Sequence, residues 1–278
     1  MLLARLSSHN RLKDLHLQYG WDIARTSYIV KATLQIIDRQ WSHLLVFDSV
    51  RLTPEKLHGF AEVIQQKSQC PLNSVFGFID GTIRKVARPT RYQKSVYNGW
   101  KRMHALKYHA VVTPDGIIAH LFGPIEGRRH DRHLWNESKL MDQLIEHAKG
   151  PDGRPLQIYG DPAYGVNRHL LSPFKSYRIT HLQKLFNKRM SKVRIVVEWV
   201  FKEIVTLFPH LDWFKNQKIL LSPLGLQFRV AVILHNAHVC LHRPQIPQYF
   251  QRENGRVIPS AGLVEPPTLE EYFHYNLE

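Results

Sequence analysis

The stretch Val75-Phe76-Gly77-Phe78-Ile79-Asp80-Gly81 is where the sequence changes from one kind of pattern to another. Its first five residues are apolar or small, which is typical of a short buried strand, and Asp-Gly predicts a turn directly after it. The chain before this point has helical periodicity, and the chain after it alternates short apolar runs with helical stretches. This order predicts a mixed α/β domain behind a helical leader.

Further strands and helices are expected downstream. Residues 108–112 and 117–122 are apolar runs separated by Thr113-Pro114-Asp115-Gly116, which predicts a β-hairpin. Residues 156–159 predict another strand, which ends at Gly160-Asp161-Pro162. Helices are expected from Asp131 to about residue 149, from about 190 to 207, and within 224–241.

The leader predicts two helices on either side of Gly20, over residues 12–19 and 23–41. Two helices separated by a glycine are compatible with a DNA-binding helix-turn-helix, and equally with any helical hairpin. Thr53-Pro54-Glu55 predicts the start of a third helix that runs through Gln66. We therefore divide the chain into three parts: a helical leader (1–70), a central α/β domain (71–243) and a proline-containing, mostly irregular tail (244–278).

The composition favours a globular protein with an acidic partner. The 278 residues carry 38 Lys and Arg against 23 Asp and Glu, a net charge of +15, and 44% are hydrophobic. A soluble chain this basic favours nucleic acid as its partner. Cys70 and Cys240 form no CxxC pair, which excludes a cysteine-based zinc finger. His235, His238 and His242 favour a packed polar face over a zinc site, because one helix rarely completes a tetrahedral shell. No membrane-spanning segment is expected.

Three acidic residues stand where the fold could bring them together. Asp80 and Asp161 each follow a predicted strand, and Glu198 interrupts an apolar helical stretch. Singly, each has an ordinary explanation: a turn for either aspartate, and for Glu198 a surface ion pair with Arg194 or Lys202. Together, two strand ends and a following helix can bring three carboxylates to one point. Mg²⁺ or Mn²⁺ would relieve their repulsion there, and two such ions can activate water at a phosphodiester.

Asp131 is a fourth acid that could join this cluster. It stands at the predicted start of a helix, where the ordinary alternative to a metal ligand is a helix N-cap.

Lysine and arginine residues flank these acids. From Gly81 to Pro114 there are eight Lys and Arg residues and no Asp or Glu, with Tyr92, Tyr97 and Trp100 interleaved. A solvated loop is the alternative to phosphate binding with aromatic stacking. The predicted DNA-binding residues are Arg84, Lys85, Arg88, Arg91, Lys94, Lys101, Arg102, Lys107, Arg128, Arg129, Lys192 and Arg194.

Several motifs, in this order, resemble those of one family. They are Phe78-Ile79-Asp80-Gly81-Thr82, Tyr97-Asn98-Gly99-Trp100-Lys101-Arg102, Gly127-Arg128-Arg129-His130-Asp131, Tyr159-Gly160-Asp161-Pro162-Ala163-Tyr164-Gly165 and Val197-Glu198-Trp199. From about residue 75 to about 241 the chain resembles the Harbinger-type transposases, which are DDE superfamily endonucleases. The resemblance implies a ribonuclease-H-like fold. It also implies that Asp80, Asp161 and Glu198 form the DDE triad, with 36 residues between the last two.

The resemblance implies an activity as well. That activity is cleavage and transfer of DNA strands with Mg²⁺ or Mn²⁺, held by the triad and by Asp131 as a further ligand. A Myb-like DNA-binding partner protein and a homo-oligomer are implied too, and nuclear residence follows from the function. The leader resembles the later part of the family's helix-turn-helix, without its first part.

Two alternatives to an active DNA nuclease stay open. One is a non-catalytic DNA-binding relic, suggested by the short leader and by Lys202, where the family often has glycine. The other is an RNA-cleaving enzyme on the same fold, although no RNA-binding motif supports it.

Overall fold

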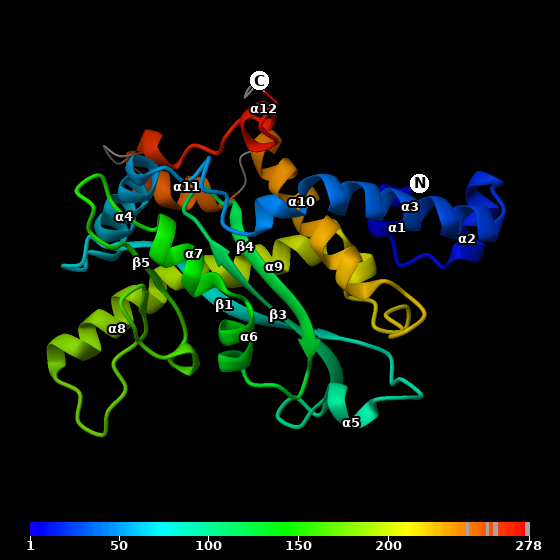
Figure 1. Ribbon diagram of the computed structural model, residues 1–278, viewed down its shortest axis with the longest axis horizontal. Coiled ribbons are helices and arrows are strands. Elements are labelled where there is room, and N and C mark those ends of the chain that lie inside the picture. Colours follow the sequence, from blue (N-terminus) through cyan, green and yellow to red (C-terminus); the bar gives the residue numbers. More distant parts are fainter. Residues whose placement is uncertain (243–244, 254–255, 258–260, 276–278) are drawn as a thin grey trace.

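The structure is a computed structural model that describes residues 1–242, 245–253, 256–257 and 261–275. A twisted β-sheet crosses the centre of the molecule, with helices packed around it, and the N-terminal helices extend to one side (Figure 1). The buried apolar side chains of the sheet and of the helices around it form one large core.

The main sheet combines antiparallel and parallel pairing. β1 (Val75–Lys85), β3 (Met103–Val112) and β4 (Ile118–Glu126) pair antiparallel in the order β4-β3-β1. On the other side of β1, β5 (Gln157–Tyr159) runs parallel to it, and β6 (Leu170–Leu171) runs parallel to β5. The predicted mixed α/β class and the predicted hairpin at 108–122 are confirmed.

The N-terminal helices begin and end at residues that the sequence marks. Gly20 ends α2 in the left-handed conformation (φ 69°), which glycine adopts without steric cost. The Asp22 side chain caps α3 by accepting hydrogen bonds from the N–H groups of Ala24 and Arg25, and Thr53 caps α4 in the same way. The bounds are α1 (Leu2–Leu6), α2 (Leu12–Tyr19), α3 (Ile23–Trp41), η1 (Ser42–Leu45) and α4 (Pro54–Ser68).

The remaining elements alternate with the strands or follow them. They are α5 (Gln93–Val96), β2 (Tyr97–Asn98), α6 (Asp131–Glu137), α7 (Leu140–His147), η2 (Pro162–Tyr164), α8 (His181–Arg194), α9 (Val196–Leu207), η3 (Pro209–Leu211), α10 (Leu224–His242), α11 (Gln245–Gln251), β7 (Arg252–Glu253), β8 (Arg256–Val257), η4 (Ala261–Val264) and α12 (Leu269–Tyr272).

The first strand is longer than the sequence predicts. β1 does not end at Asp80 but continues to Lys85, because β3 pairs with it from Phe78 onward. Asp80 therefore lies opposite Ala110 in the middle of a strand, and the turn interpretation of this residue is wrong.

Two predicted helices are each divided in two. The helix from Asp131 is interrupted by Lys139, whose φ of 53° lies in the left-handed region, so α6 and α7 are separate. The helix expected over 190–207 instead consists of α8, which begins at His181 behind the capping residue Thr180, and α9.

The tail is more ordered than its prolines predict. Ile246, Phe250, Val264 and Tyr272 are buried, so α11, η4 and α12 pack on the rest of the molecule. Pro244 and Pro259, two of the prolines behind the prediction of an irregular tail, lie outside the described residues.

The long helix α10 is a core element. It is the one helix, among those described, that is long and apolar enough by composition to cross a membrane, and 56% of its most apolar window is buried inside the fold. It packs against α3, α9, β4 and α12. Arg229 on α10 donates two hydrogen bonds to Asp38 on α3, at 2.7 and 2.9 Å. This pair connects the helical leader to the central α/β domain. The division of the chain into three parts stays a prediction.

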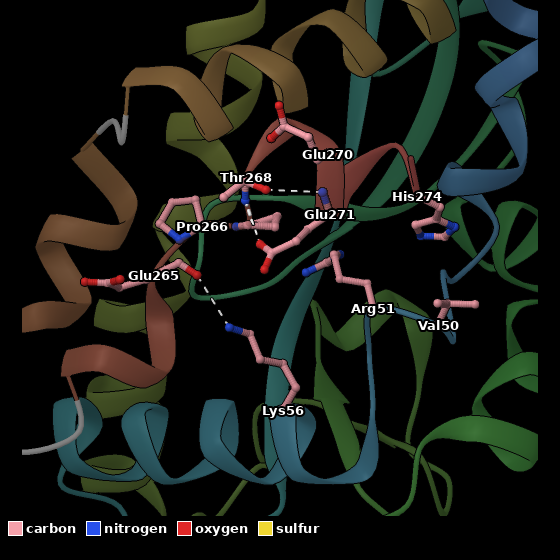
Figure 2. Close-up of a pocket in the computed structure, with 10 residues that line it drawn as sticks. Val50, Arg51, Lys56, Glu265, Pro266, Thr268, Glu270, Glu271 and His274 are labelled. Atoms are coloured by element: carbon pink, nitrogen blue, oxygen red, sulfur yellow. Dashed lines mark hydrogen bonds between the residues drawn. The ribbon is translucent and has the colours of Figure 1, made fainter. Parts of the chain in front are cut away.

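A buried ion pair attaches the turn between β3 and β4 to the segment before α4. Asp115 is fully buried and accepts hydrogen bonds from Arg51 Nη1 (2.7 Å) and Thr113 Oγ1 (2.6 Å). Arg51 is only 6% exposed, and within the described residues its Nε and Nη2 have no hydrogen-bond partner. It borders a cavity of about 560 Å³ between the start of α4 and residues 265–274 (Figure 2).

We expect Asp115→Ala to lower the free energy of unfolding by about 3–5 kcal/mol, because it leaves the Arg51 charge buried without its partner. Chemical denaturation of the purified chain measures this. Asp152→Ala is the matched control: the Asp152–Arg154 pair is exposed, so its loss should cost less than about 1 kcal/mol. Equal losses of unfolding free energy in the two variants would show that the Asp115–Arg51 pair is no more important than an exposed one.

Candidate active site

The pairing of β1 with β5 places two of the predicted acids side by side. The strands are parallel with Phe78 opposite Tyr159, so Asp80 and Asp161 each lie two residues beyond a paired position. Gly160 makes this close approach possible, because a Cβ there would lie 2.6 Å from Ile79 Cγ2. Asp161 then leaves the sheet, and one of its oxygens accepts a hydrogen bond from Ala163 N (2.9 Å).

Tyr164 lies near three of the predicted acids. Burial raises the pKa of its hydroxyl well above its usual value, and the carboxylates of Asp131, Asp80 and Asp161 raise it further. A Cβ on Gly81 would lie 3.3 Å from the Tyr164 hydroxyl and 3.5 Å from Asp131 Oδ1. Carboxylates from three separate segments are therefore near enough to one hydroxyl to raise its pKa, and we call these residues the acidic cluster (Asp80, Asp131 and Asp161).

Asp131 is the first residue of α6, and His130 is the N-cap, so the N-cap alternative for Asp131 is wrong. Its Oδ1 accepts a hydrogen bond of 2.8 Å from Lys107 Nζ on β3. The Lys107 side chain is only 9% exposed, so this lysine points into the fold beside the acidic cluster.

Glu198 approaches the acidic cluster through Arg194. Arg194 Nη1 donates to Asp80 Oδ2 at 2.8 Å, and its Nη2 lies 4.0 Å from Glu198 Oε1. Glu198 is 61% exposed at the start of α9. Lys202 is exposed, and none of the described ion pairs joins it to Glu198. Arg194, at the end of α8, is thus the link between the first and third members of the predicted triad.

Asp80 carries a charge in an environment that disfavours it. Burial raises the pKa of its carboxyl above the ordinary value and the nearby Asp161 adds to this, although Arg194 and the Gly81 N–H act in the opposite direction. The desolvation of Asp80 therefore outweighs its hydrogen-bonded ion pair.

The side chains around the cluster have the chemistry that a hard divalent cation prefers. Carboxylate oxygens are typical Mg²⁺ and Mn²⁺ ligands. The buried Tyr164 hydroxyl has no hydrogen-bond partner among the described residues, which leaves a polar group available beside them. No three acidic, histidine or cysteine side chains in the described ranges are arranged to hold a metal ion, and this includes the three histidines of α10. Arg194 and Lys107 lie where a cation would meet Asp80 and Asp131.

The predicted DNA-binding residues fall into two groups. Arg84 is turned inward, with hydrogen bonds to Thr82 Oγ1 and the Phe201 carbonyl, and Lys107 and Arg194 pair with the acids. Arg129 forms ion pairs with Glu126 and Glu137. The exposed members are Lys85, Arg88, Arg91, Lys94, Lys101, Arg102, Arg128 and Lys192.

A basic surface hollow lies next to the acidic cluster. Its volume is about 350 Å³, and it is lined by Arg128, Arg129, His130 and His133, which flank Asp131 in the sequence. Arg129 is paired with Glu126 and Glu137, so the exposed Arg128 is the charge that suits an anion such as a phosphate group.

Sequence analysis missed the role of Tyr164. The signal was present, because this aromatic residue stands three positions after Asp161. Only the structure shows that its hydroxyl is buried among carboxylates.

One comparison with known proteins finds a family. The family model for the DDE superfamily endonuclease matches residues 79–236, which is more than half of the chain and includes Asp80, Asp131, Asp161 and Glu198. No curated protein and no solved structure matches the chain. The mixed α/β fold suits this family, and the chain belongs to the DDE superfamily endonuclease family.

We expect Arg194→Gln to tighten Mn²⁺ binding about tenfold. Two charges 4 Å apart interact by about 4 kcal/mol at an effective dielectric of 20, and the partial exposure of Arg194 reduces that repulsion toward a bound cation. Titration with Mn²⁺, followed by the electron paramagnetic resonance signal of the free ion, measures the affinity. Lys192→Gln removes the same charge from an exposed position on α8 and should leave the affinity nearly unchanged. Equal affinities in the two variants would show that Arg194 does not oppose the ion.

Asp80→Asn should raise the melting temperature of the metal-free protein at pH 7. A raised pKa in the folded state means that the ionised carboxylate disfavours folding, and the neutral amide removes that cost. As the pH falls, the wild-type carboxyl becomes protonated, and the difference between the two proteins should shrink. Asp142→Asn, on the exposed surface of α7, should show no such gain. A lower melting temperature for Asp80→Asn at pH 7 would contradict this.

Proposed function

We propose that the protein is a Harbinger-type, divalent-metal-dependent nuclease that cleaves and transfers DNA strands. The observation that carries the proposal is that Asp80, Asp131 and Asp161 all raise the pKa of the buried Tyr164 hydroxyl, with Glu198 connected to Asp80 through Arg194. Family membership supports a transposase-type endonuclease. In this proposal Asp80, Asp161 and Glu198 are the catalytic triad, and Asp131 is a further metal ligand.

The sheet topology supports a ribonuclease-H-like fold for this domain. Three antiparallel strands in the order β4-β3-β1 continue into the parallel strands β5 and β6. The first acid lies on the central strand β1, and the second directly follows the neighbouring strand β5.

Each side chain of the site has a part in this proposal. Mg²⁺ or Mn²⁺, when bound, would supply an activated water and stabilise the leaving oxygen. Asp80, Asp131, Asp161 and Glu198 would hold the ions, and the Tyr164 hydroxyl, which has no hydrogen-bond partner among the described residues, would be available to orient a carboxylate. The hollow lined by Arg128 and His130 binds a phosphate of the DNA strand.

Partners and location follow from this activity. DNA is the proposed substrate, and nuclear residence is proposed because the substrate is there. A Myb-like DNA-binding partner and a homo-oligomer are further proposals that rest on the family resemblance. Lys202 leaves Glu198 accessible, which favours an active enzyme over the DNA-binding relic.

Nicking of supercoiled plasmid DNA by the purified full-length chain tests the proposed function. We expect cleavage with Mg²⁺ or Mn²⁺ and none with a chelator. Asp80→Asn, Asp161→Asn and Glu198→Gln should each reduce the rate at least about a hundredfold, because each removes a charged metal ligand. Asp142→Asn should cleave at the wild-type rate.

The same assay separates the alternatives. Salt-sensitive DNA binding without cleavage under any divalent metal would favour the DNA-binding relic. Faster cleavage of a matched RNA than of the DNA would favour the RNA-cleaving enzyme. Cleavage that survives in Asp161→Asn would show that the triad is wrongly assigned.

A further inference from the structure

The Trp100 side chain is exposed to solvent at the tip of the short hairpin formed by β2 and β3. β2 pairs with the start of β3, Tyr97 opposite His104 and Asn98 opposite Met103, so a four-residue turn projects beyond them. The Trp100 side chain on this turn is 88% exposed. An exposed tryptophan gains nothing from burial in its own fold, so its position calls for an explanation.

Specific backbone and side-chain features define the conformation of this turn. Asn98 is buried, and its Oδ1 accepts a hydrogen bond from Lys101 N (2.8 Å), which closes the turn around Trp100. Arg102 adopts a left-handed φ of 50° at the end of the turn. The backbone on either side of Trp100 is therefore fixed.

The same asparagine ties the turn to the acidic cluster. Asn98 Nδ2 donates to the Gly127 carbonyl at 2.6 Å, four residues before Asp131. The backbones are in close contact, because a Cβ on Gly127 would lie 2.5 Å from the Ala105 carbonyl oxygen and 2.7 Å from that of Val96. Trp100 and Asp131 thus stand on two segments that are joined by a hydrogen bond and by direct packing.

The charged residues around Trp100 indicate the chemistry of the partner that it would bind. Lys101, Arg102 and Arg128 are exposed around the hairpin and the Gly127 segment, and residues 81–114 contain no acid. A flat aromatic ring among cations suits a partner that is both polyanionic and planar, and a nucleobase in a DNA strand has both properties.

We propose that Trp100 stacks on an unpaired or unstacked base of the DNA strand whose phosphate lies at the acidic cluster. This inference rests on the proposed function. It adds that the protein favours a distorted substrate, because stacking on Trp100 repays part of the cost of opening the duplex. Lys101 and Arg102 bind the flanking phosphates and hold the strand against the ring.

The test compares two duplexes that differ at one position. One carries a single unpaired 2-aminopurine, and the other carries the same base fully paired. Binding to the full-length chain is measured without divalent metal, so that cleavage does not interfere. The variants are Trp100→Ala, Trp100→Phe and Ile145→Ala, the last removing an exposed apolar side chain from α7.

We expect Trp100→Ala to weaken binding to the duplex with the unpaired base about tenfold and to affect the paired duplex much less. Trp100→Phe should keep most of the affinity, because it keeps an aromatic face, and Ile145→Ala should match the wild type. Wild-type protein should quench the fluorescence of the unpaired 2-aminopurine, and Trp100→Ala should not.

Four results would overturn the inference. Equal affinity of Trp100→Ala and wild type for the unpaired duplex would remove Trp100 from DNA contact while leaving the proposed nuclease intact. An equal loss on both duplexes would show a general DNA contact rather than base stacking. Loss of self-association in Trp100→Ala, with DNA binding unchanged, would assign the ring to a protein interface. If wild-type protein binds neither duplex, the proposed function fails as well.

Discussion

The charge balance of the acidic cluster is the constraint to which the surrounding structure responds. Asp80, Asp131 and Asp161 all raise the pKa of one buried hydroxyl, and burial and the nearby Asp161 both raise the pKa of the Asp80 carboxyl. Two cationic side chains of the protein compensate these charges: Arg194 forms an ion pair with Asp80, and Lys107 forms one with Asp131. A metal ion that binds Asp80 or Asp131 must therefore compete with these two side chains.

The positions of the acids are set by the most rigid part of the fold. Asp80 lies within β1, which is paired on both sides, and Asp161 follows β5 directly. The contact between Gly160 and Ile79 fixes how closely the two strands approach. Two ligands held on neighbouring strands need little rearrangement to bind a substrate or an ion, and such preorganisation is what electrostatic catalysis requires.

Sequence patterns predicted the elements that local rules govern. The start of β1, the hairpin at Asp115, α3 and the cap of α4 follow from apolar periodicity and from turn or cap residues. The length of β1 could not be predicted, because only pairing with β3 carries the strand past Asp80. The same limit applies to the site, where Arg84 and Lys107 look like any other surface cation until the tertiary fold turns them inward.

The division of cations into two groups also shapes how DNA would approach. Arg84, Lys107, Arg129 and Arg194 are engaged with groups of the protein itself, so they add little to the field that a distant phosphate meets. The exposed charges beside the cluster then belong mainly to the β2–β3 hairpin and to the segment before α6. Because Asn98 joins those two segments, a strand drawn to this side meets Asp131 and Trp100 together. Long-range attraction and base contact would in this way converge on one edge of the acidic cluster.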